Sequence, residues 1–352
     1  MPAIPLAVVL ELTHASATVV FAVSALGIVP TAALMGRATE ELAAKSGPGI
    51  GGLLNVTFGN APELIIALFA LEAGLQEVVK ASIIGSIIGN VLLVMGAAMF
   101  AGGLRRDKQT FNATAASAQA TMLLLAATAM VMPAIFELIE GKGLPSPDAE
   151  IINYDSTVER LSLATAIVLM GSYVAGLIFS LRTHKDIFNP PYEEEEDTWG
   201  WSVRRSVIAL FVAGVLVGVM SEVLVGSITE ASESIGLSEF FIGVIVVAVV
   251  GNAAEHWVAV LVAVKNKMDL AVNIAIGSSA QIALFVAPVL VIASFLIGPG
   301  PMPLVFNGFE LGGVLLAILI AQYVTQDGES NWFEGVQLLA LYLILGIAFY
   351  YA

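Results

Sequence analysis

The sequence predicts an all-α polytopic membrane protein built from two five-helix repeats of inverted topology. A short segment ahead of them is either an extra first helix or its remnant. Hydrophobic residues make up 58% of the 352-residue chain and charged residues 12%, whereas soluble proteins average about 25% charged residues. Apolar runs of about 20 residues, each long enough to cross a bilayer as a helix, recur along the whole length. Matching motifs 192 residues apart indicate that these spans form a repeat.

The apolar runs define ten spans, and an acidic linker divides them into two sets of five. The segment at residues 1–14 contains the apolar piece Ile4–Leu12. The first repeat is expected over residues 15–182, the linker over 183–203 and the second repeat over 204–352. An odd number of spans in each repeat gives the two repeats opposite orientations in the membrane. The spans are placed near residues 15–36, 50–73, 78–101, 112–138, 159–181, 204–228, 239–264, 270–297, 306–325 and 333–351.

Loop charges predict the orientation. Of the 14 Lys and Arg residues, Lys80, Lys142 and Arg160 are assigned to one side of the membrane and the other eleven to the opposite side. Positively charged loops stay in the cytoplasm, so we expect the acidic linker, with its run YEEEED at 192–197, to be cytoplasmic. Trp199 and Trp201 are expected to anchor the end of the linker at the membrane interface. The compact length and the lack of targeting signals point to the cell (plasma) membrane.

Two apolar segments share the pattern Gly-Asn-Ala-x-Glu, namely TFGNAPELIIALFAL at 57–71 and VGNAAEHWVAVLVAV at 250–264. The triplet IGS at 84–86 recurs at 276–278 with the same offset. Inverted duplications of this kind are typical of secondary transporters, which bind their substrates near the bilayer midplane between the repeats. The matched pairs are Gly59 with Gly251, Asn60 with Asn252, and Glu63 with Glu255.

The chemistry of these motifs suits a cation. Pro62 has no N–H, so the carbonyl of Phe58 loses its helical donor, and Gly59 loosens the same turn. In the second motif Ala254 replaces Pro62, so a break there would depend on Gly251 alone. A carboxylate at bilayer depth costs roughly 2–3 kcal/mol. Two such groups are therefore expected to hold protons when the site is empty and a dication when it is loaded.

Further oxygen ligands are expected around the two Glu residues. Several such ligands, two negative charges and the absence of Cys favour Ca²⁺ over softer metals, while Mn²⁺ stays open. The Asn side chains could instead join helices, and the Ser residues could simply pack. His256 follows Glu255 and on a helix points about 100° away from it, so it is either a tuning or proton-relay group or an interhelical histidine. The candidate ligands are Asn60, Asn252, Ser86, Asn90, Ser278, Gln281 and the carbonyls of Gly59 and Gly251.

At GNAPELI and GNAAEH the chain resembles the calcium/cation antiporter superfamily, specifically its cation/proton exchanger (CAX) branch, over essentially its whole length. The resemblance implies two broken helices that cross at the membrane centre, and Ca²⁺ movement driven by a proton gradient through alternating access. It implies that Glu63 and Glu255 are the shared Ca²⁺/H⁺ carboxylates and that the Asn, Ser and Gln ligands complete the site. The first helix is short for this family. The acidic run at 193–197 is either a solvated linker or, as the family suggests, a Ca²⁺-sensing helix.

We therefore expect Ca²⁺ and H⁺ as substrates and the lipid bilayer as the environment. We expect no cofactor, no enzymatic activity and no nucleic-acid partner. The sequence leaves open whether the chain forms a homo-oligomer. Coupling to Na⁺ is the alternative, although relatives that use Na⁺ typically carry Ser/Thr-rich motifs where this chain has Asn60 and Asn252. The inverted repeat disfavours a gated cation channel. An intramembrane enzyme is disfavoured because no span carries a pair of Asp residues and HExxH is absent.

Overall fold

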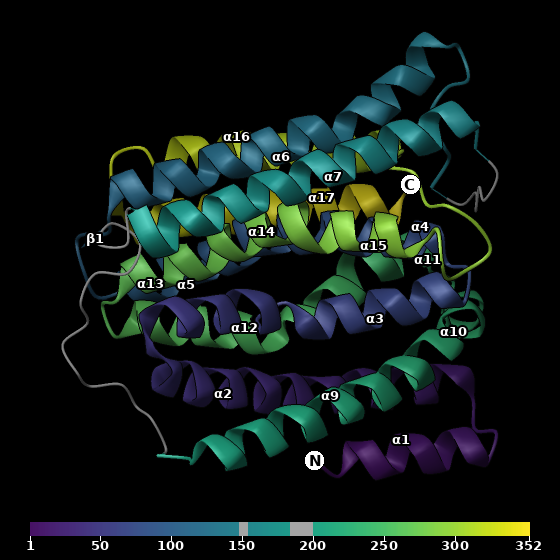
Figure 1. Ribbon diagram of the computed structural model, residues 1–352, viewed down its shortest axis with the longest axis horizontal. Coiled ribbons are helices and arrows are strands. Elements are labelled where there is room, and N and C mark those ends of the chain that lie inside the picture. Colours follow the sequence, from purple (N-terminus) through teal and green to yellow (C-terminus); the bar gives the residue numbers. More distant parts are fainter. Residues whose placement is uncertain (148–153, 184–199) are drawn as a thin grey trace.

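The computed structural model describes residues 1–147, 154–183 and 200–352. Within these ranges nearly every element is a helix (Figure 1), as the sequence predicts. Eight of the described helices are long and apolar enough to cross a membrane. The acidic run at 192–197, Trp199 and most of the predicted linker lie outside the described residues.

A ten-residue helix, α1 (Ala3–Leu12), precedes the first repeat. At 1.5 Å per residue it is about 15 Å long, roughly half of a bilayer core. The extra N-terminal segment is thus helical but too short to cross the bilayer by itself.

The next helix, α2 (Ala17–Phe58), consists of two arms. A Cβ atom placed on Gly51 would lie 2.5 Å from the carbonyl oxygen of Ala43, although eight residues span about 12 Å along a straight helix. The helix axis therefore reverses between these two residues. Figure 1 shows one arm beside α9 (Val203–Gly226) and the returning arm level with α12 (Ala248–Val264). The returning arm and α3 (Ala61–Glu72) together correspond to the predicted span 50–73.

The remaining elements follow the predicted repeat. The third span of each repeat begins at Gln76 or Met268, which are 192 residues apart. The first repeat continues with α4 (Gln76–Ile88), the π-helical segment η1 (Gly89–Val94), α5 (Met95–Gly103), β1 (Gln109–Thr110), α6 (Ala113–Ile139), α7 (Ser156–Ile178) and η2 (Phe179–Thr183). The second repeat contains, besides α9 and α12, α10 (Ile228–Ile235), α11 (Glu239–Phe241), η3 (Ile242–Val247), α13 (Met268–Val272), η4 (Asn273–Gly277), α14 (Ser278–Gln281), η5 (Ile282–Val286), α15 (Ala287–Ala293), α16 (Gly308–Val324), β2 (Glu329–Ser330) and α17 (Trp332–Tyr350).

The helices lie in layers (Figure 1). The first arm of α2 packs on α9, with α1 beside them, on one side of the molecule. The next layer holds α3, which begins within the first Gly-Asn-Ala motif, and α12, which contains the second. α4 crosses η3 closely behind this layer, and all thirteen residues of α4 are buried. α6, α7 and α16 cover the far side.

Each repeat holds the end of the other repeat's motif helix. In the first repeat Arg106 donates a hydrogen bond to the Val264 carbonyl (3.0 Å) and Gln109 donates to the Ala263 carbonyl (2.9 Å), at the C-terminal end of α12. The last carbonyls of a helix lack donors from a following turn, and a cation there is favourable, although the Ala263 carbonyl also accepts from the Asn266 N–H (2.9 Å). β1 pairs antiparallel with β2 next to this contact.

The matching contact near the end of α3 is made by the segment at residues 298–307. We call this segment the connector because it joins α15 to α16. A Cβ atom on Gly298, whose φ is +85°, would lie 2.5 Å from the carbonyl oxygen of Leu71 near the end of α3. Gln76 at the start of α4 donates to the Gly300 carbonyl (2.7 Å). The inverted symmetry therefore extends to these loops, each of which packs against the other repeat.

Candidate functional site

The two Gly-Asn-Ala motifs meet where α12 crosses the junction of α2 and α3. A Cβ atom on Gly59 would lie 3.4 Å from Oε1 of Glu255, and one on Gly251 would lie 3.1 Å from Cγ of Glu63. Each glycine thus leaves room for the carboxylate side chain of the other repeat. A larger residue at either glycine would push that carboxylate away.

The two motifs differ in backbone structure. In the first motif, α2 ends at Phe58 and Asn60 (φ −94°, ψ 17°) leads into α3, as expected from Pro62. The second motif lies inside α12, which runs through Gly251 without interruption. Ala254 retains the N–H that Pro62 lacks, so the helical hydrogen bond can form there. The two motif helices therefore cross with a sharp break in only one of them.

Asn60 is held by the second repeat. Ser278 donates to its Oδ1 (2.8 Å), and its Nδ2 donates to Oε1 of Gln281 (2.7 Å). The Ser278 hydroxyl is also 2.9 Å from Oε2 of Glu255. A hydroxyl carries a single proton, so Ser278 donates to one of these two oxygens at a time.

Asn252 is held in a similar way by the first repeat. Its Nδ2 donates to Ser86 Oγ (3.0 Å) and to the Ala248 carbonyl (2.8 Å), and its Oδ1 lies 3.5 Å from Nδ2 of Asn90. His256 Nε2 lies 3.1 Å from Oδ1 of Asn90. His256 therefore turns away from Glu255, as its place on the helix predicts, and contacts the polar network from the other side.

The carboxylates of Glu63 and Glu255 differ in their hydrogen-bond partners. Glu255 has Ser278 as a hydrogen-bond partner, but neither oxygen of Glu63 has one among the described residues, and both oxygens are buried. The corresponding hydroxyl, Ser86, is engaged by Asn252 instead. The two carboxylates are also close enough to interact electrostatically. The Glu63 oxygens are thus the ones left available to a proton or a cation.

The structure brings the predicted site residues together, but their contacts do not follow the repeat symmetry strictly. Gln281 accepts a hydrogen bond from Asn60, whereas the side-chain amide nearest to Asn252 is Asn90, which donates to it. At the offset of 192, Asn90 corresponds to Ile282 rather than Gln281. Among the described residues no group of three His, Asp or Glu side chains could hold a metal, so a cation here would depend on amide, hydroxyl and backbone oxygens as well. Coordination by these residues remains a prediction.

For the Ca²⁺ transport that the sequence predicts, replacing Asn90 with Ala is expected to lower the apparent Ca²⁺ affinity about tenfold, because it removes the contact that joins His256 to Asn252 and such supporting contacts are worth 10–100-fold in metal affinity. Ser279→Ala is the matched control, since the buried Ser279 hydroxyl donates to the Ala275 carbonyl one turn earlier (2.8 Å) and, among the described residues, to no other group. Initial rates of Ca²⁺ uptake over a range of Ca²⁺ concentrations would measure both variants. An unchanged affinity in Asn90→Ala would contradict the expectation.

The chain is similar to a family and to several characterised proteins. Residues 16–182 and 205–351 match the sodium/calcium exchanger protein family. The Ca²⁺/H⁺ antiporter ChaA of Bacillus subtilis is 47% identical over 99% of this chain and 96% of its own length. The Ca²⁺/H⁺ antiporter of a Synechocystis species is 47% identical over 95% of this chain and 91% of its own length.

Solved structures are similar over the same length. The structure of native YfkE has a TM-score of 0.84 to this chain at 42% identity, covering 100% of this chain and 98% of YfkE. The crystal structure of the H⁺/Ca²⁺ exchanger CAX has a TM-score of 0.71 at 16% identity, covering 99% and 89% of the two chains. At that identity the second match supports the fold alone.

Proposed function

The chain belongs to the sodium/calcium exchanger protein family, and from this premise we propose that it exchanges Ca²⁺ for H⁺ by alternating access, with Glu63 and Glu255 as the carboxylates that the two ions share. It is a multi-pass integral membrane protein. Its curated relatives at 47% identity are Ca²⁺/H⁺ antiporters, and the similar YfkE is a Ca²⁺/H⁺ antiporter as well. Ca²⁺ is a substrate of this reaction and no cofactor is needed.

The observation that carries the proposal is the crossing of the two motifs. One carboxylate comes from each repeat, each fits beside the glycine of the other repeat, and the Glu63 oxygens are buried without a hydrogen-bond partner among the described residues. An empty pair of buried carboxylates is costly. Either one Ca²⁺ or protons can remove that cost, so the two ions compete for the same oxygens.

The neighbouring amides fit a hard cation. The side-chain oxygens of Asn60 and Asn252 each accept one internal hydrogen bond, and a carbonyl oxygen has a second lone pair for a metal. With Ser86, Ser278, Gln281 and the carbonyls of Gly59 and Gly251, these groups supply the six to eight oxygen ligands that Ca²⁺ takes. The polar network therefore holds the ligands in place on both sides of the bound ion.

The cell membrane is the proposed location, with the end that carries Arg106, Lys265 and Lys267 in the cytoplasm. The bacterial relatives support the location, and the excess of positive charge at that end supports the orientation. The acidic linker between the repeats would then be cytoplasmic too.

Purified protein in vesicles with an imposed proton gradient is expected to take up ⁴⁵Ca²⁺, and the uptake is expected to stop when the gradient is collapsed. The physical reason is that protons must leave the shared carboxylates before Ca²⁺ binds. The same vesicles with a Na⁺ gradient at clamped pH provide the comparison. Uptake that follows Na⁺ rather than H⁺ would assign the chain to sodium coupling, and uptake that ignores both gradients would indicate a channel.

A further inference from the structure

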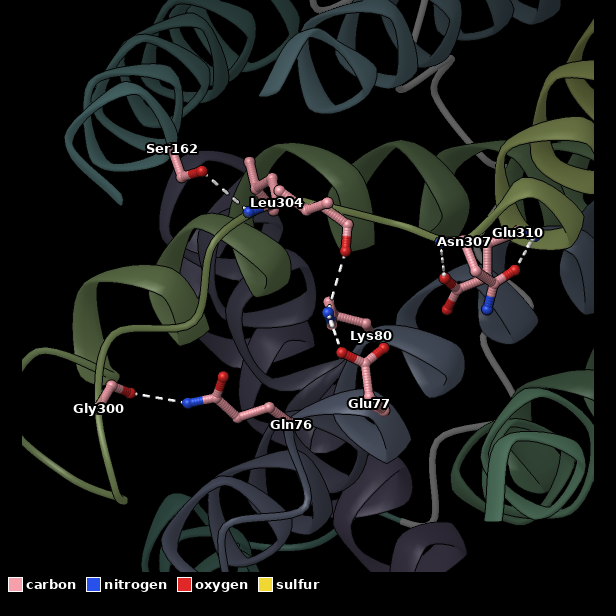
Figure 2. Close-up of polar contacts among 9 residues, drawn as sticks. Gln76, Glu77, Lys80, Ser162, Gly300, Leu304, Asn307 and Glu310 are labelled. Atoms are coloured by element: carbon pink, nitrogen blue, oxygen red, sulfur yellow. Dashed lines mark hydrogen bonds and ion pairs between the residues drawn. The ribbon is translucent and has the colours of Figure 1, made fainter. Parts of the chain in front are cut away.

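Lys80 is a buried cation outside the proposed transport site. The sequence predicts Lys80 to be one of the loop charges on one side of the membrane. The residue instead lies in the second turn of α4, and its side chain is completely buried. A charged group at this depth is costly without partners and by default suggests a function. Figure 2 shows how the surrounding groups provide those partners.

The Lys80 ammonium has partners in both repeats. It forms an ion pair with Glu77, one turn earlier in the same helix, and it donates a hydrogen bond to the Val305 carbonyl of the connector (2.9 Å). It also lies 5.6 Å from the centre of the Tyr154 ring. Glu310, in the first turn of α16, interacts with it electrostatically. The bond to Val305 is thus a direct tether from α4 to the second repeat.

The connector is an extended segment that depends on such tethers. Met302, Leu304, Val305 and Phe306 are fully buried. Irregular backbone is tolerated inside a membrane protein only where other groups satisfy its N–H and C=O groups. Five side chains from the surrounding elements do this: Gln76 at Gly300, Ser294 at Met302, Ser162 at Leu304, Lys80 at Val305 and Glu310 at Asn307.

The tether lies on the helix that carries part of the site. Ser86 follows Lys80 by six residues, about 9 Å along the helix axis, and it accepts the hydrogen bond from Asn252. Asn90 comes one turn later. Because α4 is buried along its whole length, anchoring one end fixes its height and rotation at the other. A shift of about 1 Å at a ligand is enough to impair a site of this kind.

We propose that Lys80 is a positioning residue for transport: its hydrogen bond to the Val305 carbonyl anchors α4 to the connector and thereby holds Ser86 and Asn90 in register with Asn252. The inference rests on the proposed function, because it assumes that these residues line the transport site. The opposing interpretation is that the Glu77–Lys80 pair only stabilises the fold. A buried ion pair of that sort can often be replaced by uncharged residues without loss.

Two variants separate these interpretations, because one keeps the tether and the other keeps the charge balance of the pair. Glu77→Gln leaves the Lys80 donor in place but removes its ion-pair partner, so we expect a lower melting temperature and a KM for Ca²⁺ within about threefold of wild type. Lys80→Met/Glu77→Gln removes both charges and the donor while keeping the apolar stem. We expect its melting temperature to be near wild type and its KM about tenfold higher, with little change in kcat.

A pair of uncharged variants tests the position of the connector, to which Lys80 is tethered, without changing the ion pair. Ser162→Ala removes the acceptor of the Leu304 N–H (3.0 Å) and loosens the connector, so it is expected to raise KM about threefold. Ser82→Ala is its control, because the buried Ser82 hydroxyl on α4 donates to the Val79 carbonyl of its own helix (2.8 Å) and to no other group in the described part of the chain. This pair remains informative if the double variant does not fold.

The measurements are proton-driven ⁴⁵Ca²⁺ uptake in vesicles and thermal unfolding of the same purified proteins. A KM that rises in the double variant and in Ser162→Ala, without following the melting temperature, supports positioning. A wild-type KM in a well-folded double variant, or a KM that follows melting temperature across the series, overturns it. Absence of uptake in the wild-type protein would refute the proposed function. That outcome is distinct from failure of the positioning proposal, in which the wild-type protein transports Ca²⁺ normally.

Discussion

Glu63→Gln and Glu255→Gln are each expected to reduce proton-driven Ca²⁺ uptake by at least about 100-fold, because Ca²⁺ affinity depends strongly on the number of charged ligands. Each substitution leaves one carboxylate to hold a dication and removes one group that can exchange it for protons. The geometry makes the loss mutual, since each carboxylate lies against the motif glycine of the other repeat. Neither residue can replace the other.

The measurement is ⁴⁵Ca²⁺ uptake into vesicles with the proton gradient set independently. Glu140→Gln is the control: this Glu is exposed at the end of α6, away from the site, and its loss is expected to leave uptake unchanged. Thermal unfolding of each variant separates loss of function from loss of fold. Uptake that survives either site substitution would place the ion-coupling groups elsewhere.

Gly85→Ala is expected to disrupt the protein, whereas Gly277→Ala is expected to be tolerated, although both glycines occupy the middle of the repeated triplet IGS. A Cβ atom on Gly85 would lie 2.0 Å from the carbonyl oxygen of Val244 and 2.7 Å from its Cα. These are backbone atoms of η3 that cannot rotate aside, so α4 and η3 would have to separate. Overpacking of this kind costs about 1–3 kcal/mol or more.

The environment of Gly277 is more adaptable. The nearest atoms to a Cβ there are Oδ1 of Asn273 at 3.1 Å and Nε2 of Gln119 at 3.4 Å, both at the ends of polar side chains. Melting temperature and Ca²⁺ uptake of the two purified variants would compare them directly. Equal damage in both would show that the close approach of α4 to η3 is not what requires the glycine.

Much of the architecture follows from the sequence because it is a repeat of strongly apolar segments. The duplicated motif, with its offset of 192, correctly predicts an inverted repeat, and hydropathy locates eight of the ten predicted spans at described helices that are long and apolar enough to cross a membrane, the exceptions being 50–73 and 306–325. The apolar pattern also leads to Glu63 and Glu255, since a carboxylate in an apolar run is unusual wherever it occurs. The break at Asn60 follows from Pro62 alone, a purely local effect.

What the sequence does not reveal depends on contacts between distant segments. The pairing of Asn90 with Asn252 departs from the repeat by one position, and Asn90 lies in η1, where π-helix replaces regular α-helix. The reversal within α2 brings Gly51 back to Ala43. The burial of Lys80 depends on a carbonyl 225 residues later in the chain. Neither hydropathy nor the repeat spacing carries information of this kind.

The long separation between Lys80 and Val305 has a consequence for how the protein is made. A chain folds from its N-terminus as it is synthesised, so α4 enters the membrane well before the ribosome has produced the connector. During that interval Glu77 is the partner of Lys80 that travels in the same helix, one turn away, and it keeps this part of α4 neutral. The ion pair is therefore the contact of Lys80 that can form first. Completion of the second repeat then provides the Val305 carbonyl and converts a helix that can merely be inserted into one with a fixed position.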